Sequence, residues 1–212
     1  MKKLVILLVS LLLAGCGLID SSNSGNVANS NDVNFYYNPD NRCVETRIIE
    51  KEYENTDPQK MLELVDYVFI GTINESKSEI YDDGKIKENL KVTVKKKIKG
   101  DLSDEIVISR DGGRVSVPAY IQYPGETILD KDSLAGLSNL NLSNQLNGQI
   151  YVEVVPKAYF MADNTKEYVF FVRDNNGLEI YNDAYGMLEV IDQDKAKNVY
   201  SNEECIISEL SK

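Results

Sequence analysis

Histidine and tryptophan are both absent from this chain of 212 residues, and there are only 3 cysteines and 5 prolines. Histidine is the usual general base near neutral pH and the commonest zinc ligand. Its absence excludes Ser-His and Cys-His nucleophile pairs and disfavours a zinc site. Positive charge is scarce too, because 23 Lys and Arg face 34 Asp and Glu, for a net charge of -11. Nucleic-acid phosphates repel such a protein, so nucleic acid is not an expected partner.

What the chain does contain is sufficient for one packed core. Hydrophobic residues make up 42% of the sequence, and 13 of the residues are tyrosine. This content lies well above the range of disordered proteins. The length fits one domain preceded by an export segment.

The N-terminus has the organisation of an export signal. Two lysines follow Met1, residues 4–13 are apolar apart from Ser10, and Leu-Ala-Gly-Cys occupies residues 13–16. The apolar run is about half as long as a membrane-spanning helix requires. We therefore predict a cleaved signal peptide over residues 1–15 rather than a permanent transmembrane helix.

The Leu-Ala-Gly-Cys motif resembles the lipobox of bacterial lipoproteins. This resemblance implies that a diacylglyceryl group is attached to the thiol of Cys16 and that the signal is cut before it. The mature protein would then be held by lipid at the extracytoplasmic face of a membrane in the bacterial cell envelope. The alternative is an ordinary cysteine beside an ordinary cleavage site.

Residues 16–34 are rich in Ser, Asn and Gly, which predicts a lipidated, flexible tether. At this length the tether would span roughly 20 to 25 Å, so the folded part can stand off the membrane. Residues 35–212 are predicted to form a single mainly-β domain.

The pattern within this domain predicts one short helix followed by many short strands. Thr56, Asp57 and Pro58 precede apolar residues at helical spacing, which is typical of a helix start. Strands are expected at residues 67–73, 90–98, 106–109, 150–155, 167–172, 178–181 and 187–191. The tail, residues 192–210, is expected to be partly helical. Short strands between glycine turns favour an antiparallel barrel or sandwich over an alternating α/β fold.

The long stretch of residues 114–148 lacks regular strand periodicity. Structureless loops longer than about 12 to 15 residues are uncommon in compact domains and are usually functional or disordered. We expect this segment either to form a contact surface or to hold a helix that closes one end of a barrel. Its aromatic residues and their neighbours can equally be exposed contacts or core: Tyr120, Tyr123, Tyr159 and Phe160.

The order of these elements is similar to the OB-fold barrels of tissue inhibitors of metalloproteinases and netrin modules, and to their bacterial relatives. The similarity rests on the segments at residues 66–71, 98–100, 106–113, 167–171 and 185–186. It implies an antiparallel OB-like barrel of about five to seven strands, with its core at about residues 57–191. The animal inhibitors chelate a protease zinc through a free N-terminal cysteine amine. An acylated Cys16 cannot do so, and no functional residue is carried over.

The two remaining cysteines, Cys43 and Cys205, form an even pair in an exported protein, which predicts a disulfide. The alternative is two free thiols. Two thiolates without histidine leave a tetrahedral zinc site half empty, so no metal site is expected. The Asp-Gly segments at residues 82–84, 111–113 and 174–177 lack the ligand spacing of an EF-hand and predict hairpin turns.

Neither a catalytic pair nor a cofactor motif is evident in the sequence. We therefore expect a non-enzymatic binding or interaction module, held at the membrane by lipid on Cys16, with a protein or cell-wall partner. The alternative is an extracytoplasmic enzyme that uses carboxylate or tyrosine chemistry, for example on cell-wall glycans.

Overall fold

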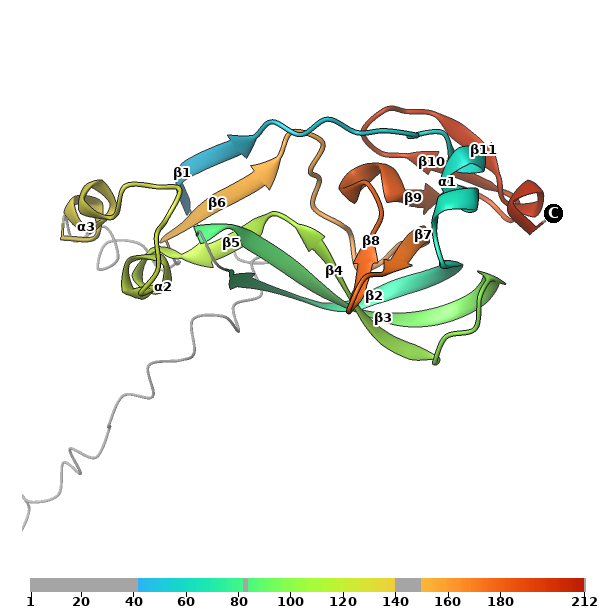
Figure 1. Cartoon of the computed structure of the whole chain (residues 1–212), viewed down its shortest axis with the longest axis horizontal. Coiled ribbons are helices and arrows are strands. Elements are labelled where there is room, and N and C mark those ends of the chain that lie inside the picture. Colours follow the sequence, from blue (N-terminus) through green and yellow to red (C-terminus); the bar gives the residue numbers. More distant parts are fainter. Residues whose placement is uncertain (1–41, 82–83, 140–149, 212) are drawn as a thin grey trace, which may run out of the picture.

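The computed structural model describes residues 42–81, 84–139 and 150–211. These residues form two β-sheets with short helices at their ends (Figure 1), which confirms the predicted mainly-β class. In chain order the elements are β1 (Arg42–Ile49), α1 (Pro58–Leu64), β2 (Tyr67–Ile80), β3 (Ile86–Lys99), β4 (Glu105–Asp111), β5 (Gly113–Ser116), α2 (Val117–Gln122), α3 (Lys131–Asn139), β6 (Ile150–Pro156), β7 (Glu167–Asp174), β8 (Leu178–Ile180), η2 (Asp183–Gly186), β9 (Met187–Val190), β10 (Lys195–Asn198), β11 (Glu204–Ile206) and η3 (Ile207–Ser211).

The larger sheet has the strand order β11-β10-β9-β7-β2-β3-β4-β8. Strands β2, β3 and β4 are consecutive antiparallel neighbours, and β7 returns after a long connection to pair with β2. This is the order of a Greek key. Strand β8 pairs antiparallel with β7 and also parallel with β4, through Ser109 and Glu179. The pairing therefore leads from β7 through β2, β3, β4 and β8 back to β7.

The central strand β7 is buried on both sides because its alternate side chains enter different cores. Phe170 lies in one apolar cluster with Phe69, Leu90 and Ile108. Phe171 lies in a second cluster beneath α1 and η3. A strand that is buried on both faces has a continuous apolar sequence, and this is the pattern from which residues 167–172 were predicted.

The predicted short helix is confirmed as α1. The side chain of Asp57 caps it by accepting the backbone N–H groups of Gln59 at 2.8 Å and Lys60 at 3.3 Å, and Pro58 occupies the first turn. Met61 anchors the helix in the second apolar cluster. The helix is thus positioned over the larger sheet by one cap and one buried side chain.

The smaller sheet has the order β1-β6-β5, with β1 and β6 parallel and β5 and β6 antiparallel. A third apolar cluster lies under it and includes Val152 and Val154 of β6, Tyr120 of α2 and Leu134 of α3. The buried Tyr120 hydroxyl donates to the carbonyl of Gly84 at 3.2 Å. Within the stretch of residues 114–148, the described part therefore holds helices and packed side chains rather than a loop, but α2 and α3 pack on the core of the small sheet and not across the end of a barrel. Residues 140–149 lie outside the described part.

The tail, predicted to be partly helical, does end in the short helix η3, and before it β10 and β11, which were not predicted, pair antiparallel. Neither β1 nor β5 was predicted, since both depend on pairing with the distant strand β6.

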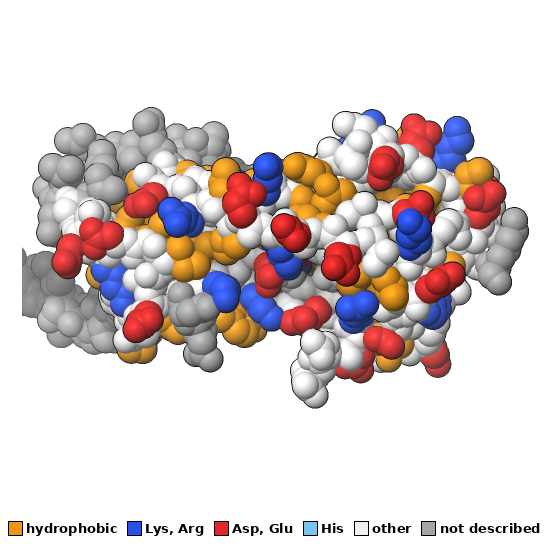
Figure 2. All heavy atoms as spheres, turned by 45° about the horizontal axis from the view of Figure 1, so that its top comes forward, with side chains coloured by type: hydrophobic (Ala, Val, Ile, Leu, Met, Phe, Trp, Pro, Cys, Tyr) orange, Lys and Arg blue, Asp and Glu red, His pale blue; other side chains and the backbone are white. Residues whose placement is uncertain are grey.

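The predicted signal peptide at residues 1–15, Cys16 and the tether at residues 16–34 lie outside the described residues. Within the described ranges, no helix has both the length and the apolar character needed to cross a bilayer. Acidic and basic side chains are interspersed over the face shown in Figure 2, so the negative net charge does not gather there in one patch.

Candidate functional site

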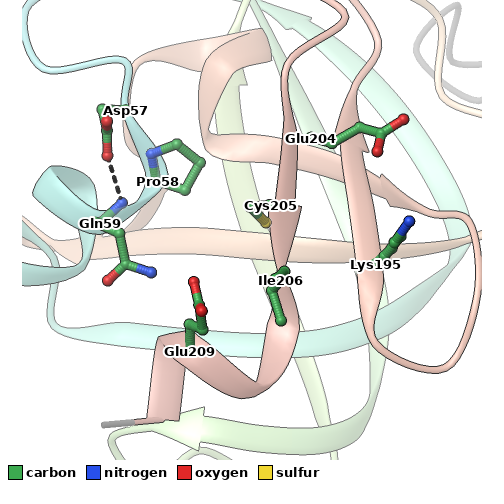
Figure 3. Close-up of a pocket in the computed structure, with 8 residues that line it drawn as sticks. All are labelled: Asp57, Pro58, Gln59, Lys195, Glu204, Cys205, Ile206 and Glu209. Atoms are coloured by element: carbon green, nitrogen blue, oxygen red, sulfur yellow. Dashed lines mark hydrogen bonds between the residues drawn. The ribbon is translucent and has the colours of Figure 1, made fainter.

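An open pocket of about 300 Å³ lies between the start of α1 and the strand β11 at the edge of the larger sheet. Figure 3 shows Gln59 and Glu209 extending into the space between α1 and η3, while the side chains of Glu204 of β11 and Lys195 of β10 lie on the side of β11 away from α1. The lining residues come from four segments: Asp57, Pro58, Gln59, Lys195, Glu204, Cys205, Ile206 and Glu209. The pocket therefore depends on α1 being held against the C-terminal part of the chain.

The lining carries three carboxylates against one ammonium group. Asp57 is already engaged in the cap of α1, whereas the side chains of Glu204 and Glu209 belong to exposed residues. A lining with this balance attracts a positively charged group rather than an anion. The thiol of Cys205 adds no nucleophile, because burial raises its pKa to about 11 and keeps it protonated at neutral pH.

A second group of charged side chains connects the segment after β1 to the larger sheet and η2. The Lys51 ammonium lies 2.9 Å from Asp111 and 2.7 Å from Asp183. Asp183 also accepts the backbone N–H of Asp111 at 3.2 Å. Lys87 and Glu179 form an ion pair of 2.6 Å at the same place. These groups surround a cavity of about 60 Å³, which has room for ordered water but not for a substrate of ordinary size.

Asp183 is held under strain within this group. Both Asn182 and Asp183 have left-handed backbone angles, with φ of 55° and 50°, a conformation that costs free energy for residues other than glycine. Burial raises the pKa of Asp183, although its contact with Lys51 opposes the shift. Burial also raises the pKa of Tyr53, helped by the negative charge of Asp183.

The segment between β1 and α1 is fixed by these contacts. Lys51 reaches Asp111 and Asp183, and the carbonyl of Glu54 accepts hydrogen bonds from Asn182 and, at 3.5 Å, from the Tyr181 hydroxyl. The cluster therefore attaches the strap that links the small sheet to α1, which is a structural role.

A third charged group is an ion pair inside the larger sheet. Glu88 of β3 and Arg110 of β4 are cross-strand partners, and the guanidinium Nη2 lies 2.6 Å from the carboxylate. Arg110 also donates to the carbonyl of Phe160 at 2.8 Å. The hydroxyls of Ser76 and Tyr159 donate to Glu88. Both charges are thus multiply hydrogen-bonded, as burial requires.

The aromatic residues beside the long stretch form no open contact surface with this geometry. Tyr120 is buried. The rings of Tyr159 and Phe160 flank the Arg110 guanidinium, with centroids 4.6 and 5.3 Å from its central carbon. Of the two alternatives for these three residues, exposed contact or packing inside the domain, the structure therefore shows packing inside the domain.

The prediction of a disulfide is wrong. Cys43 and Cys205 are both free, the first exposed in β1 and the second partly buried in β11. The two strands belong to different sheets and lie at opposite ends of the molecule in Figure 1. A disulfide requires Cα atoms within about 7 Å of each other. The even number of cysteines in the sequence did not mean that these two residues lie close together. Cys16, the predicted lipidation site, lies outside the described residues.

The predicted hairpin turn at residues 174–177 is confirmed, since β7 and β8 pair antiparallel and Asn176 and Gly177 adopt positive φ between them. The predicted hairpin at residues 111–113 is wrong, because Gly112 and Gly113, also with positive φ, lead from β4 in the larger sheet to β5 in the smaller one. Residues 82 and 83 of the third predicted turn lie outside the described part. Among the described residues, no group of three or more Asp, Glu or Cys side chains is placed to hold a metal ion.

The charged clusters were missed by sequence reasoning, although part of the signal was there. Glu88 lies two and four residues before the apolar residues Leu90 and Val92. Because alternate side chains of a strand point to the same face, this spacing alone predicts that the Glu88 side chain points into the core. Arg110 likewise follows Ile108 at a spacing of two. Lys51 and Asp183 had no such pattern, because their meeting depends on the path of the strap.

In comparisons with known proteins, no family model, no curated protein and no solved structure matches the chain. The fold and the sites define its class as a mainly-β protein whose described residues form two sheets and include an acidic, open pocket.

Proposed function

We propose that this protein is a lipoprotein of the bacterial cell envelope, anchored by lipid on Cys16, whose domain works as a non-enzymatic binding module. The pocket between α1 and β11 is the observation that carries the binding role. It is open, it is about 300 Å³ in volume, and its lining is acidic without a usable nucleophile.

The pocket supports binding of a group with a positive charge, such as an amine on a protein or cell-wall partner. Its volume is at the lower end of the range for small-molecule sites, which is about 300 to 1,000 Å³. A ligand that fills it would therefore be small, or would be one side chain of a larger partner.

A titration with 1,4-diaminobutane, followed by amide chemical shifts, tests the pocket. We expect saturable shifts at residues of α1 and β11, and an affinity about 1.5- to 5-fold weaker in Glu209→Gln, the range for losing one exposed charge contact. Glu63→Gln is the matched control, since it makes the same charge change on an exposed residue of α1 that does not line the pocket. Shifts that do not saturate, or equal losses in both variants, would contradict a specific site.

Lipid anchoring is tested separately by growing cells with a fatty-acid analogue. The wild type should carry the label and remain with the membrane, and Cys16→Ser should lose both properties. Cys43→Ser is the control for a thiol elsewhere in the chain and should keep the label. An unlabelled wild type would remove the anchor from the proposal.

We further propose that the circuit of β2, β3, β4, β8 and β7 is an OB-like barrel. The Greek-key order and the pairing of β8 with both β4 and β7 support this interpretation, because the OB fold is a five-stranded Greek-key barrel. The segment from β5 through α2 and α3 to β6 would then be an insertion between β4 and β7, which pairs with β1 to form the small sheet.

An enzyme with carboxylate or tyrosine chemistry is less well supported. Asp183 and Tyr53 have the raised pKa values that catalytic groups often show. The cavity beside Asp183, however, holds only about 60 Å³, and Asp183 already binds Lys51 of the strap. The observations therefore favour binding over catalysis.

A further inference from the structure

Strand β1 forms one edge of the small sheet, and among the described strands nothing pairs with its outer side. It is eight residues long, and Ile48 in it is 56% exposed. A long edge strand with an exposed apolar side chain is a template for another strand. We propose that the outer edge of β1 pairs antiparallel with β1 of a second copy of this chain.

The backbone places specific residues at this edge. The carbonyl of Ile49 accepts the N–H of Lys157 at 3.2 Å, so Ile49 faces the side of β6. Because backbone groups of successive strand residues point to alternate sides, Thr46 and Ile48 present their N–H and C=O groups to the outer edge. The irregularity between Cys43 and Glu45 lies at the other end of the strand.

Charge selects one register among those centred on the middle of the strand. A two-fold axis at Glu45 would place Glu45 opposite itself, and an axis at Arg47 would place Arg47 opposite itself. An axis at Thr46 instead places each Glu45 opposite Arg47 of the second copy. Opposite charges across strands are favourable and like charges are unfavourable.

The same register places the two Thr46 residues opposite each other on the axis. Val44 takes no part, because it lies in the irregularity between Cys43 and Glu45 and packs against the third apolar cluster. Within the described part of one copy, Glu45 and Arg47 have no ion-pair partner. Both charges are therefore available to the second copy, and the strand is complementary to itself as an isologous contact requires.

The contact is short, so the dimer is expected to be weak in dilute solution. The proposed lipid anchor would raise its effective concentration at a membrane. The pairing itself does not rest on the anchor, because concentrated Cys16→Ser protein should form the same contact.

Cysteine crosslinking of the full chain tests the register. In a background with Cys43→Ser and Cys205→Ser, Thr46→Cys should form a disulfide-linked dimer under mild oxidation, both on membranes and in concentrated Cys16→Ser protein. Directly opposite residues lie about 5.5 Å apart, within disulfide range. Ile48→Cys should not crosslink with itself, since its two copies would be about 14 Å apart along the strands.

A mixture of differently tagged Glu45→Cys and Arg47→Cys proteins should crosslink between the two tags, because the register places these two positions opposite each other. In the Thr46→Cys protein, Glu45→Arg or Arg47→Glu alone should reduce crosslinking, and the two changes together should restore it. All these side chains lie at the edge, so an unchanged melting temperature shows that each variant is folded.

Three results would overturn the proposal. The first is folded Thr46→Cys protein that stays monomeric both on membranes and at high concentration. The second is Ile48→Cys that crosslinks with itself as well as Thr46→Cys does, which indicates random collision. The third is a double variant, Glu45→Arg with Arg47→Glu, that does not restore crosslinking of the Thr46→Cys protein.

Discussion

The buried pair of Glu88 and Arg110 leads to the sharpest prediction for stability. Its side chains are 4% and 0% exposed, and the guanidinium is surrounded by the carboxylate, the carbonyl of Phe160 and two aromatic rings. Arg110→Met removes the cation and leaves a carboxylate inside the sheet, with only hydroxyl donors to Glu88 among the contacts described above. Breaking one partner of such a pair costs about 3 to 5 kcal/mol.

For a domain of this size, that loss corresponds to a fall in melting temperature of about 6 to 20 °C, at about 2 to 4 °C per kcal/mol. Glu88→Met should have a loss of the same order, since it leaves Arg110 charged and buried. The double variant, with Met at both positions, should recover at least half of either loss, because no unpaired charge remains.

Urea unfolding followed by circular dichroism measures these differences, with the slope m checked for a constant change in exposed surface. Lys97→Met is the control, because Lys97 pairs with Asp101 at the surface and its removal should leave the midpoint unchanged. If the losses of the two single variants simply added in the double variant, the two residues would not act as one unit, and the reasoning would be refuted.

Three further predictions concern other parts of the fold. Burial raises the pKa of Asp183, so ionisation of this carboxyl group opposes folding. The unfolding free energy of the wild type, compared with that of Asp183→Asn, should therefore fall as the pH rises from about 4 through the raised pKa. A difference between the two proteins that does not change with pH would contradict this. Alkylation at pH 8 with peptide mapping should label exposed Cys43 quickly and Cys205 slowly, since the latter has a pKa of about 11, whereas a disulfide-linked peptide would show that the two sites do meet. Gly71→Ala should cost about 1 to 3 kcal/mol in thermal unfolding because the new methyl would lie 2.7 Å from a carbonyl oxygen and a valine methyl of β3, while Gly136→Ala, with open space around it, should not destabilise.

Much of the larger sheet could be predicted from local pattern. Alternation marks β3, a continuous apolar run marks β7, and Asp57 with Pro58 marks the start of α1. These signals are local because side-chain parity and helix capping involve residues only a few positions apart.

Parts of the candidate site could be predicted in the same way, and others could not. Asp57 was expected at the start of a helix, but the pocket requires Glu209 and Cys205 to come beside it from the far end of the chain. The tail was expected to be partly helical, and η3 is helical. Pairing of β10 with β9 decides that Lys195–Asn198 forms a strand before it.

The sequence by itself determined the mainly-β class, the position of α1, most strands of the larger sheet and the turn between β7 and β8. The tertiary structure alone decided that the strap brings Lys51 to Asp183, that β1 becomes an open edge beside β6, and that Cys43 and Cys205 stay apart. The physical reason is that each of these features depends on residues far apart in the chain. Strand pairing and the burial of three separate cores decide which distant residues meet. Neither of these can be predicted from the periodicity of apolar residues in a short stretch of sequence.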